Sequence, residues 1–361
     1  MERSAAATLD ARILAAIRSY ALDESEFDRL ACDIFAYQFR TNAPYAAYAR
    51  SCGITPDRLP HRAAAIPAVP VAAFKEAVLS TVGAGGAGLW FETSGTTAGI
   101  GGRHYLETAE LYEAALLAGF DRALLADGAR LRYLLLVPDV RTRPHSSLGF
   151  MMDRIAELRG DGRGGRFVDG DALDIDGLLG ALDAAVADGA AVCIAATAFA
   201  LVAAVDALRA RGRRFGLPRG SRVMETGGFK GRARVVEQVQ LYAEVSAGLG
   251  IPAAAIVGEY GMTELSSQYY DSPGSRTQAQ RCKLAPPWLR ALVVDPQGAP
   301  VAPGVVGAIR HIDCANRSSA VAIETDDLGA LTPAGLVLLG RDRGAELRGC
   351  SLDAEDLAAR A

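Results

Sequence analysis

The sequence predicts a mixed α/β protein whose main sheet is mostly parallel, and two observations indicate this class. Short apolar or β-rich runs at residues 131–137, 191–196, 221–225 and 251–257 alternate with segments of helical periodicity. Such alternation is typical of a parallel sheet covered by helices. After Pro287 the pattern changes to closely spaced strand-like runs with turn residues between them, which predicts a small, mainly antiparallel β subdomain.

The N-terminal part of the chain is expected to be helical. Apolar residues recur at three- and four-residue spacing in segments 9–20 and 23–39, and the polar stretch 23–26 is typical of a helix start. Prolines then break the chain into extended pieces before the first core strand at 89–93. The predicted parts of the chain are a helical lead-in at 1–84, an α/β core at 85–285, a small β subdomain at 286–340, and a hinge and tail at 341–361.

Composition and charge exclude several functions. The formal net charge of -4 and the scattered arginines give no basic surface for nucleic acid. The longest apolar run, 190–205, is shorter than the roughly 20 residues that span a bilayer. No apolar block of signal-peptide length begins the chain, so a cytoplasmic location is expected. The six cysteines form no CxxC pair and the four histidines no HExxH motif, so neither a zinc site nor a disulfide framework is predicted.

A glycine- and hydroxyl-rich segment follows the strand predicted at 89–93. Hydroxyl groups of Ser94, Thr96 and Thr97 can donate hydrogen bonds, and Gly95 and Gly99 leave the main-chain amides accessible. Backbone amides and hydroxyls of such a loop can wrap a polyphosphate without a neighbouring lysine. We therefore expect a phosphate-binding loop here, with an ordinary strand-to-loop turn as the alternative.

A second segment, Gly-Glu-Tyr-Gly-Met-Thr-Glu at 258–264, follows the apolar run that ends at residue 257. The aromatic face of Tyr260 beside glycines can stack on a purine. The hydroxyl of Thr263 can donate to a phosphate, and the carboxylate of Glu264 can hold Mg²⁺ against it. These residue types in this order indicate a nucleotide site.

The segment Thr-Asp-Asp-Leu-Gly at 325–329 is expected to form a tight acidic turn after a strand at 320–324. A carboxylate in this turn can accept hydrogen bonds from both hydroxyls of a ribose. Arg341, which follows Gly340, can donate to the same ribose or to a phosphate. An exposed turn without a ligand is the alternative for Asp326 and Asp327.

The order and spacing of these motifs resemble the adenylate-forming superfamily of acyl ligases over roughly residues 85–350. Four further segments resemble its acyl-protein synthetase, or LuxE-type, branch. These segments are PHSSLG at 144–149, TAFA at 197–200, ETGGFK at 225–230 and RGCSL at 348–352. The resemblance implies the large N-terminal domain of such ligases, with a mostly parallel sheet, a helical N-terminus and a small β subdomain. Because the chain ends at Ala361, the mobile C-terminal domain of the superfamily is expected to be absent.

The resemblance also implies a reaction and a set of site residues. ATP and Mg²⁺ would activate a carboxylic acid, fatty or aromatic, as an acyl-adenylate. The residues implied in ATP binding are Thr93, Ser94, Gly95, Thr96, Thr97, Gly99, Gly227, Gly228, Glu259, Tyr260, Gly261, Asp327 and Arg341, with Thr263 and Glu264 serving phosphate and Mg²⁺. The residues expected at the acyl substrate are His145, Ser146, Ala198, Gly258 and Lys230. A structural cap at 145–147 and a solvated loop lysine at 230 are the alternatives.

Cys350 is the candidate acyl acceptor, because in the LuxE branch a cysteine near the C-terminus accepts the acyl group. Thiolates are favoured beside arginine and at helix N-termini, and Arg348 precedes a helix predicted at 353–360. The acidic side chains of Asp353 and Glu355 oppose thiolate formation. An ordinary buried cysteine is the alternative.

Three functions remain open at this point. The first is adenylation followed by acyl transfer to a protein thiol, either Cys350 itself or the pantetheine arm of a carrier protein. The second is an acyl ligase that delivers the acyl group to coenzyme A. The third is a docking subunit that binds nucleotide or acyl group without full activity. The expected partners are therefore a small carboxylic acid and a carrier protein, CoA or an acyl-reductase.

Overall fold

The computed structural model describes residues 2–93, 101–169, 172–227, 237–278 and 280–341. The chain divides into two compact units. The first unit contains Met1–Ala118, Met262–Gln268 and Leu284–Ala361, and the second contains Gly119–Gly261 and Tyr269–Lys283. Within the described ranges, no helix is both long and apolar enough to cross a membrane.

The second unit is built on a twisted, mainly parallel sheet. Its strand order is β12-β11-β10-β9-β8-β4-β5. The strands are β4 (Arg132–Leu136), β5 (Gly165–Arg166), β8 (Val192–Thr197), β9 (Arg222–Thr226), β10 (Ile256–Tyr260), β11 (Tyr269–Asp271) and β12 (Lys283–Leu284). Strands β5, β4, β8, β9 and β10 pair in parallel, and β11 runs antiparallel to β10. A mostly parallel sheet, as predicted, is confirmed.

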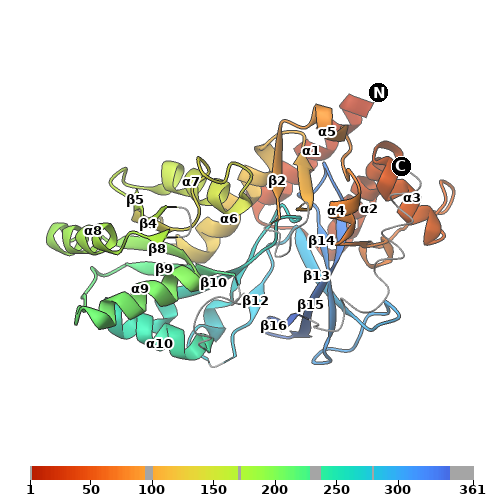
Figure 1. Ribbon diagram of the computed structural model, residues 1–361. Coiled ribbons are helices and arrows are strands. Elements are labelled where there is room, and N and C mark those ends of the chain that lie inside the picture. Colours follow the sequence, from red (N-terminus) through yellow and green to blue (C-terminus); the bar gives the residue numbers. More distant parts are fainter. Residues whose placement is uncertain (1, 94–100, 170–171, 228–236, 279, 342–361) are drawn as a thin grey trace. The chain divides into compact units, whose positions relative to one another are not determined.

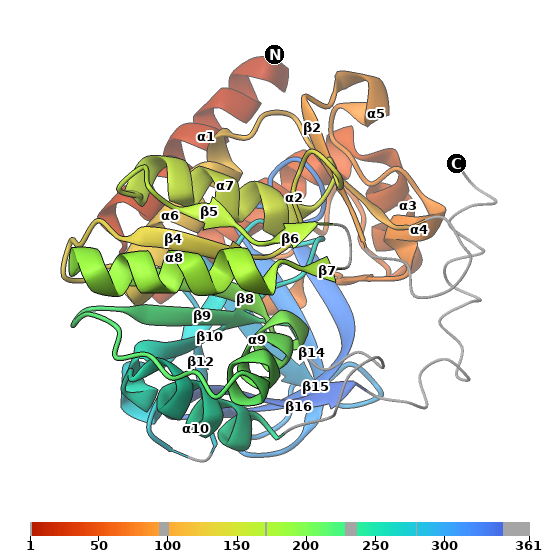
Figure 2. The same ribbon diagram turned by 60° about the vertical axis from the view of Figure 1, so that its left-hand side comes forward.

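Helices cover both faces of this sheet (Figures 1 and 2). They are α6 (Glu110–Leu124), which begins in the first unit, α7 (Ser147–Arg159), α8 (Ile175–Asp188), α9 (Ala198–Ala210) and α10 (Gln238–Leu249). Figure 1 shows α6 and α7 on one side of the sheet and α9 and α10 on the other. The core beneath α8, α9 and α10 joins their apolar residues to alternate strand residues such as Leu134, Ile194, Val223 and Ile256. The short strands β6 (Val168–Asp169) and β7 (Ala172–Leu173) form a separate antiparallel pair.

The first unit contains the helical N-terminus and the antiparallel β structure that the sequence predicts, joined in one unit. The helices are α1 (Glu2–Ser19), α2 (Glu24–Thr41), α3 (Ala43–Ser51), and the short α4 (Ala73–Glu76) and α5 (Gly83–Gly86). The sheet contains β13 (Leu289–Val294), β14 (Gly307–Asp313), β15 (Ala322–Thr332) and β16 (Gly335–Arg341) in that order, and β1 (Val69–Pro70) pairs in parallel with β15. A separate hairpin joins β2 (Leu89–Glu92) to β3 (Arg103–Leu106).

The helix start predicted at residues 23–26 is confirmed as a complete capping box. The Asp23 carboxylate accepts from the Glu26 amide at 2.8 Å, and the Glu26 carboxylate accepts from the Asp23 amide at 3.0 Å. These bonds satisfy donors that the first turn of α2 would otherwise leave free.

Replacing Asp23 with alanine is expected to lower the free energy of unfolding by about 1 kcal/mol, because the Glu26 amide loses its side-chain acceptor. Urea denaturation of the full chain measures the effect. The matched control is Glu24→Ala, since Glu24 lies in the same exposed first turn outside the capping box. Equal destabilisation by the two substitutions would contradict a specific capping role.

Two local predictions are wrong, and both concern the boundaries of a strand. The run at 251–257 was expected to be a strand, but residues 253–255 form a 3₁₀ turn after Pro252 and β10 begins at Ile256. Apolar sequence alone does not separate a buried turn from a buried strand. Strand β10 also extends through Gly258, Glu259 and Tyr260, which were expected to follow the strand.

The tight acidic turn predicted at 325–329 is also wrong, because β15 continues through it to Thr332. This stretch pairs with β14 on one side and with β16 on the other, and a bulge between Leu328 and Gly329 absorbs the irregularity. The hydroxyl of Thr325 donates to the Ile309 carbonyl at 3.0 Å. Ladder bonds on both sides thus override the turn preference of the two aspartates.

Candidate active site

The parallel strands of the second unit end in polar residues at one edge of the sheet. Strands β8, β9 and β10 are consecutive neighbours, and their carboxyl ends are Thr197, Thr226 and Tyr260. Ligands of open α/β sheets bind in the region outside the carboxyl ends of the strands. This edge therefore forms one part of the candidate site.

Two buried glutamates lie on the adjacent strands β9 and β10 near this edge. The Thr226 hydroxyl donates to the Glu259 carboxylate, and these two residues face each other in the strand register. The Tyr242 hydroxyl donates to the Glu225 carboxylate at 2.8 Å. Burial raises the pKa of both glutamates, that of Glu259 to about 7. Glu259 is therefore a carboxyl group that changes its charge near neutral pH.

The stability of the protein is expected to depend on the titration of Glu259. Its pKa is about 7 in the folded protein and 4.5 without burial, so between these values the folded state retains a proton that the unfolded state loses. Stability from this group therefore falls as the pH rises from about 4.5 to 7, by an amount on the order of 3 kcal/mol at most. Glu259→Gln should become more stable relative to wild type between pH 5 and pH 8.

Urea denaturation of wild type and Glu259→Gln at the two pH values measures this difference. The control is Glu237→Gln, because Glu237 is an exposed glutamate of the same unit. If the difference between Glu259→Gln and wild type did not change with pH, the raised pKa of Glu259 would be refuted.

Gly258 is held inside β10 by a cluster of charged side chains. Its amide donates to the Asp271 carboxylate at 2.7 Å, and Asp271 also forms ion pairs with Arg281 and Lys283, both at 2.8 Å. A Cβ atom on Gly258 would lie 2.5 Å from the Lys283 Nζ. Only glycine therefore fits here without displacing Lys283, whatever the role of Gly258 toward a substrate.

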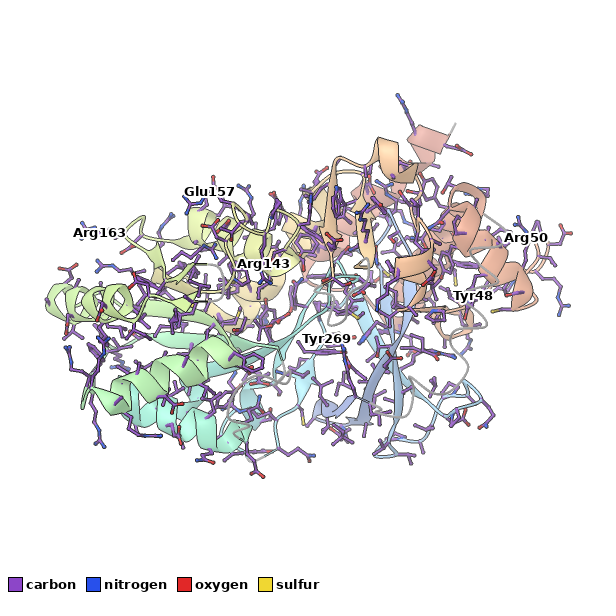
Figure 3. The ribbon with its side chains drawn as sticks, viewed as in Figure 1. Tyr48, Arg50, Arg143, Glu157, Arg163 and Tyr269 are labelled. Atoms are coloured by element: carbon purple, nitrogen blue, oxygen red, sulfur yellow. The ribbon has the colours of Figure 1, made fainter. Side chains whose placement is uncertain are left out.

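Gly227 directly follows β9 and has a φ of +80°. No atom of a described residue lies within 4 Å of the position that its Cβ would occupy. On the neighbouring strand the half-buried ring of Tyr260 lies 5.7 Å from the ring of Tyr269, which is labelled in Figure 3. Gly227 thus directly follows β9, and Tyr260 ends the adjacent strand β10.

Hydroxyl groups at this edge also cap helices. Ser146 accepts a hydrogen bond from the Gly149 amide at 3.0 Å at the start of α7, and Thr197 accepts from the Ala200 amide at 3.3 Å at the start of α9. Ser146 therefore serves as a structural cap, which was one of the two roles expected of it. Ala198, the first residue of α9, is buried. Half-buried His145 directly precedes the cap.

In the first unit, a buried histidine and asparagine hold the segment that contains Thr263 and Glu264. The ring of His104 on β3 contacts the Thr263 carbonyl through Nδ1 at 2.8 Å and the Asn316 side-chain oxygen through Nε2 at 2.9 Å. The Asn316 amide donates to the Glu264 carbonyl at 2.9 Å. Both carbonyls are thus fixed by side chains, while the Glu264 side chain is only 5% exposed.

Burial lowers the pKa of His104, and its two oxygen partners favour the protonated ring. The side-chain amide nitrogen of Asn316 donates to the Glu264 carbonyl, so the side-chain oxygen of Asn316 faces His104. The orientation of each side chain in this network is therefore set by the next one.

A buried aspartate fixes the residues that follow. Asp313 accepts from the Ser266 amide and the Ser267 hydroxyl, both at 2.8 Å, and from the Ala315 amide at 3.0 Å. The Trp288 indole donates to the Ser267 hydroxyl at 3.0 Å. Burial raises the pKa of Asp313 to about 6. These hydrogen bonds fix Ser266 and Ser267, and with them segment 262–268, against other residues of the first unit.

The hairpin of β2 and β3 is closed at its tip end by Thr93. The Thr93 amide donates to the Gly102 carbonyl at 2.9 Å, and the Gly102 amide donates to the Thr93 hydroxyl at 2.8 Å. A Cβ atom on Gly101 would lie 2.6 Å from the Thr93 carbonyl oxygen. These contacts define both ends of the glycine- and hydroxyl-rich segment, whose Ser94, Gly95, Thr96, Thr97 and Gly99 lie outside the described residues.

Asp327 and Arg341 lie opposite each other on β15 and β16. The Arg341 Nε donates to the Asp327 carboxylate at 2.9 Å, and the side chains are 63% and 18% exposed, respectively. The two residues that the sequence analysis assigned to one ribose are therefore adjacent. An exposed cross-strand ion pair contributes little to stability.

The predicted site residues that the structure describes are divided between the two units. Glu259, Tyr260, Gly261, Gly227, Gly258 and Ala198 belong to the second unit, whereas Thr93, Thr263, Glu264, Asp327 and Arg341 belong to the first. The predicted residues outside the described ranges also include Gly228, Lys230 and Cys350. Sequence reasoning missed His104, Asn316 and Asp313, although polar residues within apolar strand-like runs are a usable signal for buried networks.

Several solved structures share the fold of this chain. A 2-hydroxyisobutyryl-CoA ligase in complex with 2-HIB-AMP and CoA aligns at 16% identity and a TM-score of 0.66, covering 89% of this chain and 69% of its own. ATP-bound MatB from Rhodopseudomonas palustris aligns at 18% identity with a TM-score of 0.51, and the alignment covers 70% of this chain and 47% of the MatB chain. McyG A-PCP complexed with phenylalanyl-adenylate aligns at 18% identity with a TM-score of 0.52, and the alignment covers 71% of this chain and 47% of the McyG chain. The fold is that of the large domain of adenylate-forming acyl ligases.

A comparison with models of protein families identifies the family of the chain. Residues 162–357 match the model described as acyl-protein synthetase, LuxE, and the chain belongs to this family. The predicted resemblance is therefore confirmed. No curated protein sequence matches the chain significantly. The chain spans about half the length of the MatB and McyG chains with which it aligns.

Proposed function

We propose that the protein activates a carboxylic acid with ATP and passes the acyl group to a protein thiol. In the first step a carboxylate oxygen attacks the α-phosphorus, the bond to the β-phosphate breaks, and pyrophosphate leaves. In the second step a thiolate attacks the acyl carbon, a thioester forms, and AMP leaves with the oxygen that bridged carbon and phosphorus. The observation that carries this proposal is the buried network of His104 and Asn316, which fixes Thr263 and Glu264 in a chain with the adenylate-forming fold.

Several described residues fit a bound ATP. Gly227, which has no described atom near its Cβ position, and the half-buried ring of Tyr260 suit an adenine at the carboxyl edge of β9 and β10. Asp327 can accept hydrogen bonds from ribose hydroxyls, and Arg341 beside it can donate to the ribose or a phosphate. Thr93, at the tip end of the β2–β3 hairpin, is fixed by its hydrogen bonds to Gly102 and is proposed to lie beside the phosphates. ATP-bound MatB, which shares the fold, supports this assignment.

Glu264 fits a magnesium site. Mg²⁺ in nucleotide enzymes is commonly held by one or two carboxylates and the substrate phosphates, and Glu264 provides a buried carboxylate on a main chain fixed at its carbonyl. Magnesium bound there would neutralise phosphate charge during displacement. Thr263 would donate to a phosphate from the same fixed turn. We propose a cytoplasmic location, where ATP is available as co-substrate.

Cys350 is the acceptor that we propose for the acyl group. The LuxE family match extends to residue 357 and so includes this cysteine. Of the described cysteines, Cys193 and Cys314 are fully buried, and burial raises the pKa of both thiols. Neither is suited to serve as a thiolate nucleophile at neutral pH. A carrier-protein pantetheine is the other thiol that this chemistry accommodates.

Pyrophosphate exchange and covalent labelling test the two steps separately. Labelled pyrophosphate should enter ATP when a suitable acid is present, and a panel of fatty and aromatic acids identifies the substrate class. Cys350→Ala should retain this exchange and lose at least nine-tenths of the acyl label on the protein. Cys52→Ala is the matched control, since Cys52 is an exposed cysteine.

The outcomes separate the proposed functions. Lack of exchange with every acid would leave a docking subunit and overturn the enzyme proposal. Label that survives in Cys350→Ala would show that another acceptor is used. The second candidate is an acyl-CoA ligase, which the CoA complex of the 2-hydroxyisobutyryl-CoA ligase favours. That function requires release of acyl-CoA by Cys350→Ala at the wild-type rate.

A further inference from the structure

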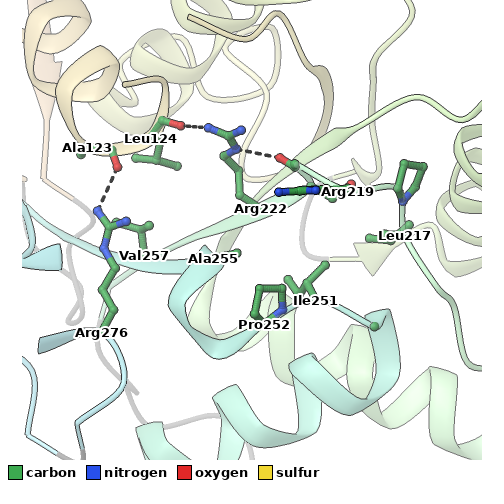
Figure 4. A pocket seen from close by; sticks show the side chains of 14 residues that line it. Ala123, Leu124, Leu217, Arg219, Arg222, Ile251, Pro252, Ala255, Val257 and Arg276 are labelled. Atoms are coloured by element: carbon green, nitrogen blue, oxygen red, sulfur yellow. Dashed lines mark hydrogen bonds between the residues drawn. The ribbon is translucent and has the colours of Figure 1, made fainter. Parts of the chain in front are cut away.

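A recess lies at the opposite edge of the sheet of the second unit from the candidate active site. Its volume is about 280 Å³, and it is bordered by the segments that precede β9 and β10 and by the end of α6. Figure 4 shows Arg219, Arg222 and Arg276 around it, together with an apolar wall that includes Ile251 and Pro252. The recess is therefore separate from the carboxyl ends of the strands.

Positive charge exceeds negative charge around this recess. Arg222 forms an ion pair with Asp127 at 2.8 Å. Within the described part of the chain, neither Arg219 nor Arg276 has a carboxylate partner. Arg219 is exposed, whereas Arg276 is partly buried. Two guanidinium groups at the recess thus lack a neutralising acid.

Asp271, whose main-chain oxygen contacts Arg276, already has two other cationic partners. Asp271 is shared between Arg281 and Lys283, so one carboxylate faces two cations. The main-chain oxygen of Asp271 lies 3.4 Å from the Arg276 guanidinium. Asp271 therefore cannot neutralise Arg276 without leaving one of its own partners.

Carbonyl groups at the end of α6 accept hydrogen bonds from two of the arginines, but other guanidinium donors remain without an acceptor among the described residues. Arg276 donates through Nη2 to the Ala123 carbonyl at 2.9 Å, and Arg222 donates to the Leu124 carbonyl. Cations at a helix C-terminus are favourable, which explains these two contacts. Among the described residues, the Nη1 group of Arg276 and the whole Arg219 guanidinium have no acceptor.

We propose that this recess binds the phosphate group of a small phosphorylated metabolite. Guanidinium groups match phosphate oxygens in charge and in fork geometry. The volume of about 280 Å³ suits a phosphate with a short organic body against the apolar wall, and lies at or below the lower limit of typical ligand pockets. The ligand would occupy the amino-terminal edge of the sheet, so its binding does not require the nucleotide site.

Calorimetric titration of the full chain with inorganic phosphate tests the proposal. Ionic strength is held constant with sodium chloride, and a non-hydrolysable ATP analogue is present at saturation to occupy the nucleotide site. Wild type should show saturable binding, and Arg219→Gln and Arg276→Gln should each weaken it at least tenfold. Arg163→Gln is the matched control, because Arg163 is exposed on the same unit and its side chain has no partner among the described residues (Figure 3).

Arg219→Gln keeps the test decisive if Arg276→Gln does not fold, since Arg219 is exposed and makes no described contact. Phosphate binding that is equally strong in Arg219→Gln and wild type would overturn the proposal. Equal weakening by Arg163→Gln would do the same, because it would show a general charge effect. Glycerol 3-phosphate should bind more tightly than inorganic phosphate if the apolar wall contacts the organic body.

Discussion

Glu264→Gln is expected to lower the rate of carboxylate-dependent pyrophosphate exchange about 100-fold, which corresponds to the loss of one preorganised electrostatic group in an active site. The substitution keeps the shape of the side chain and removes its charge. Asn316 holds the main-chain carbonyl of Glu264, so the turn should remain in place in the variant. The loss would then report on the carboxylate itself. Initial exchange rates at saturating acid and ATP give the comparison.

Glu324→Gln is the matched control for this experiment. Glu324 is a partly buried glutamate of the first unit that pairs with Arg310. Its substitution should leave exchange within threefold of wild type. A similarly small effect of Glu264→Gln would remove Glu264 from the reaction. Raising the magnesium concentration should restore part of the lost rate if the carboxylate holds the metal.

His104→Ala is the second substitution with a large expected effect. Among the described residues, it leaves the Thr263 carbonyl and the Asn316 side-chain oxygen without a hydrogen-bond partner. Each buried unsatisfied group costs about 1 to 3 kcal/mol. The turn that carries Thr263 and Glu264 would lose its support. We expect exchange to fall between about tenfold and 100-fold at temperatures where the variant is still folded.

A positioning role for His104 predicts more than lost stability. Asn42→Ala is the control, because Asn42 is also a buried residue of the first unit and donates to the Ser319 carbonyl at 3.0 Å. It should reduce the free energy of unfolding without changing kcat of the folded enzyme. His104→Gln should recover part of kcat if a donor to the Thr263 carbonyl is what matters. Unchanged kcat in folded His104→Ala would restrict His104 to stability.

The strands of the second unit could be predicted because their apolar runs are short and separated by helical periodicity. Residues 131–137, 191–196 and 221–225 lie within one residue of the boundaries of β4, β8 and β9. The N-terminal boundary of α2 was also predictable, since Asp23 and Glu26 form a local capping signal. Both signals are local in sequence, which is why they could be read without tertiary information.

The predictions that failed depended on contacts between distant segments. Asp326 and Asp327 have turn propensity, but pairing with β14 and β16 extends the strand through them. The site residue His104 was missed for the same reason: its partners Thr263 and Asn316 are 159 and 212 positions away. Sequence motifs identified Thr263 and Glu264 themselves, whereas the side chains that orient them became visible only in the fold.

The division of the chain into units limits how this protein can be taken apart. The chain passes between the units at 118/119, 261/262, 268/269 and 283/284, so neither unit is one continuous stretch. The first of these passages lies within α6, and the second divides the 258–264 motif after Gly261. A fragment cut anywhere between these points would lack strands of one unit or segment 262–268 of the other. Neither unit of this chain can therefore be produced as one continuous fragment, and substitutions meant to probe either unit are best made in the intact chain.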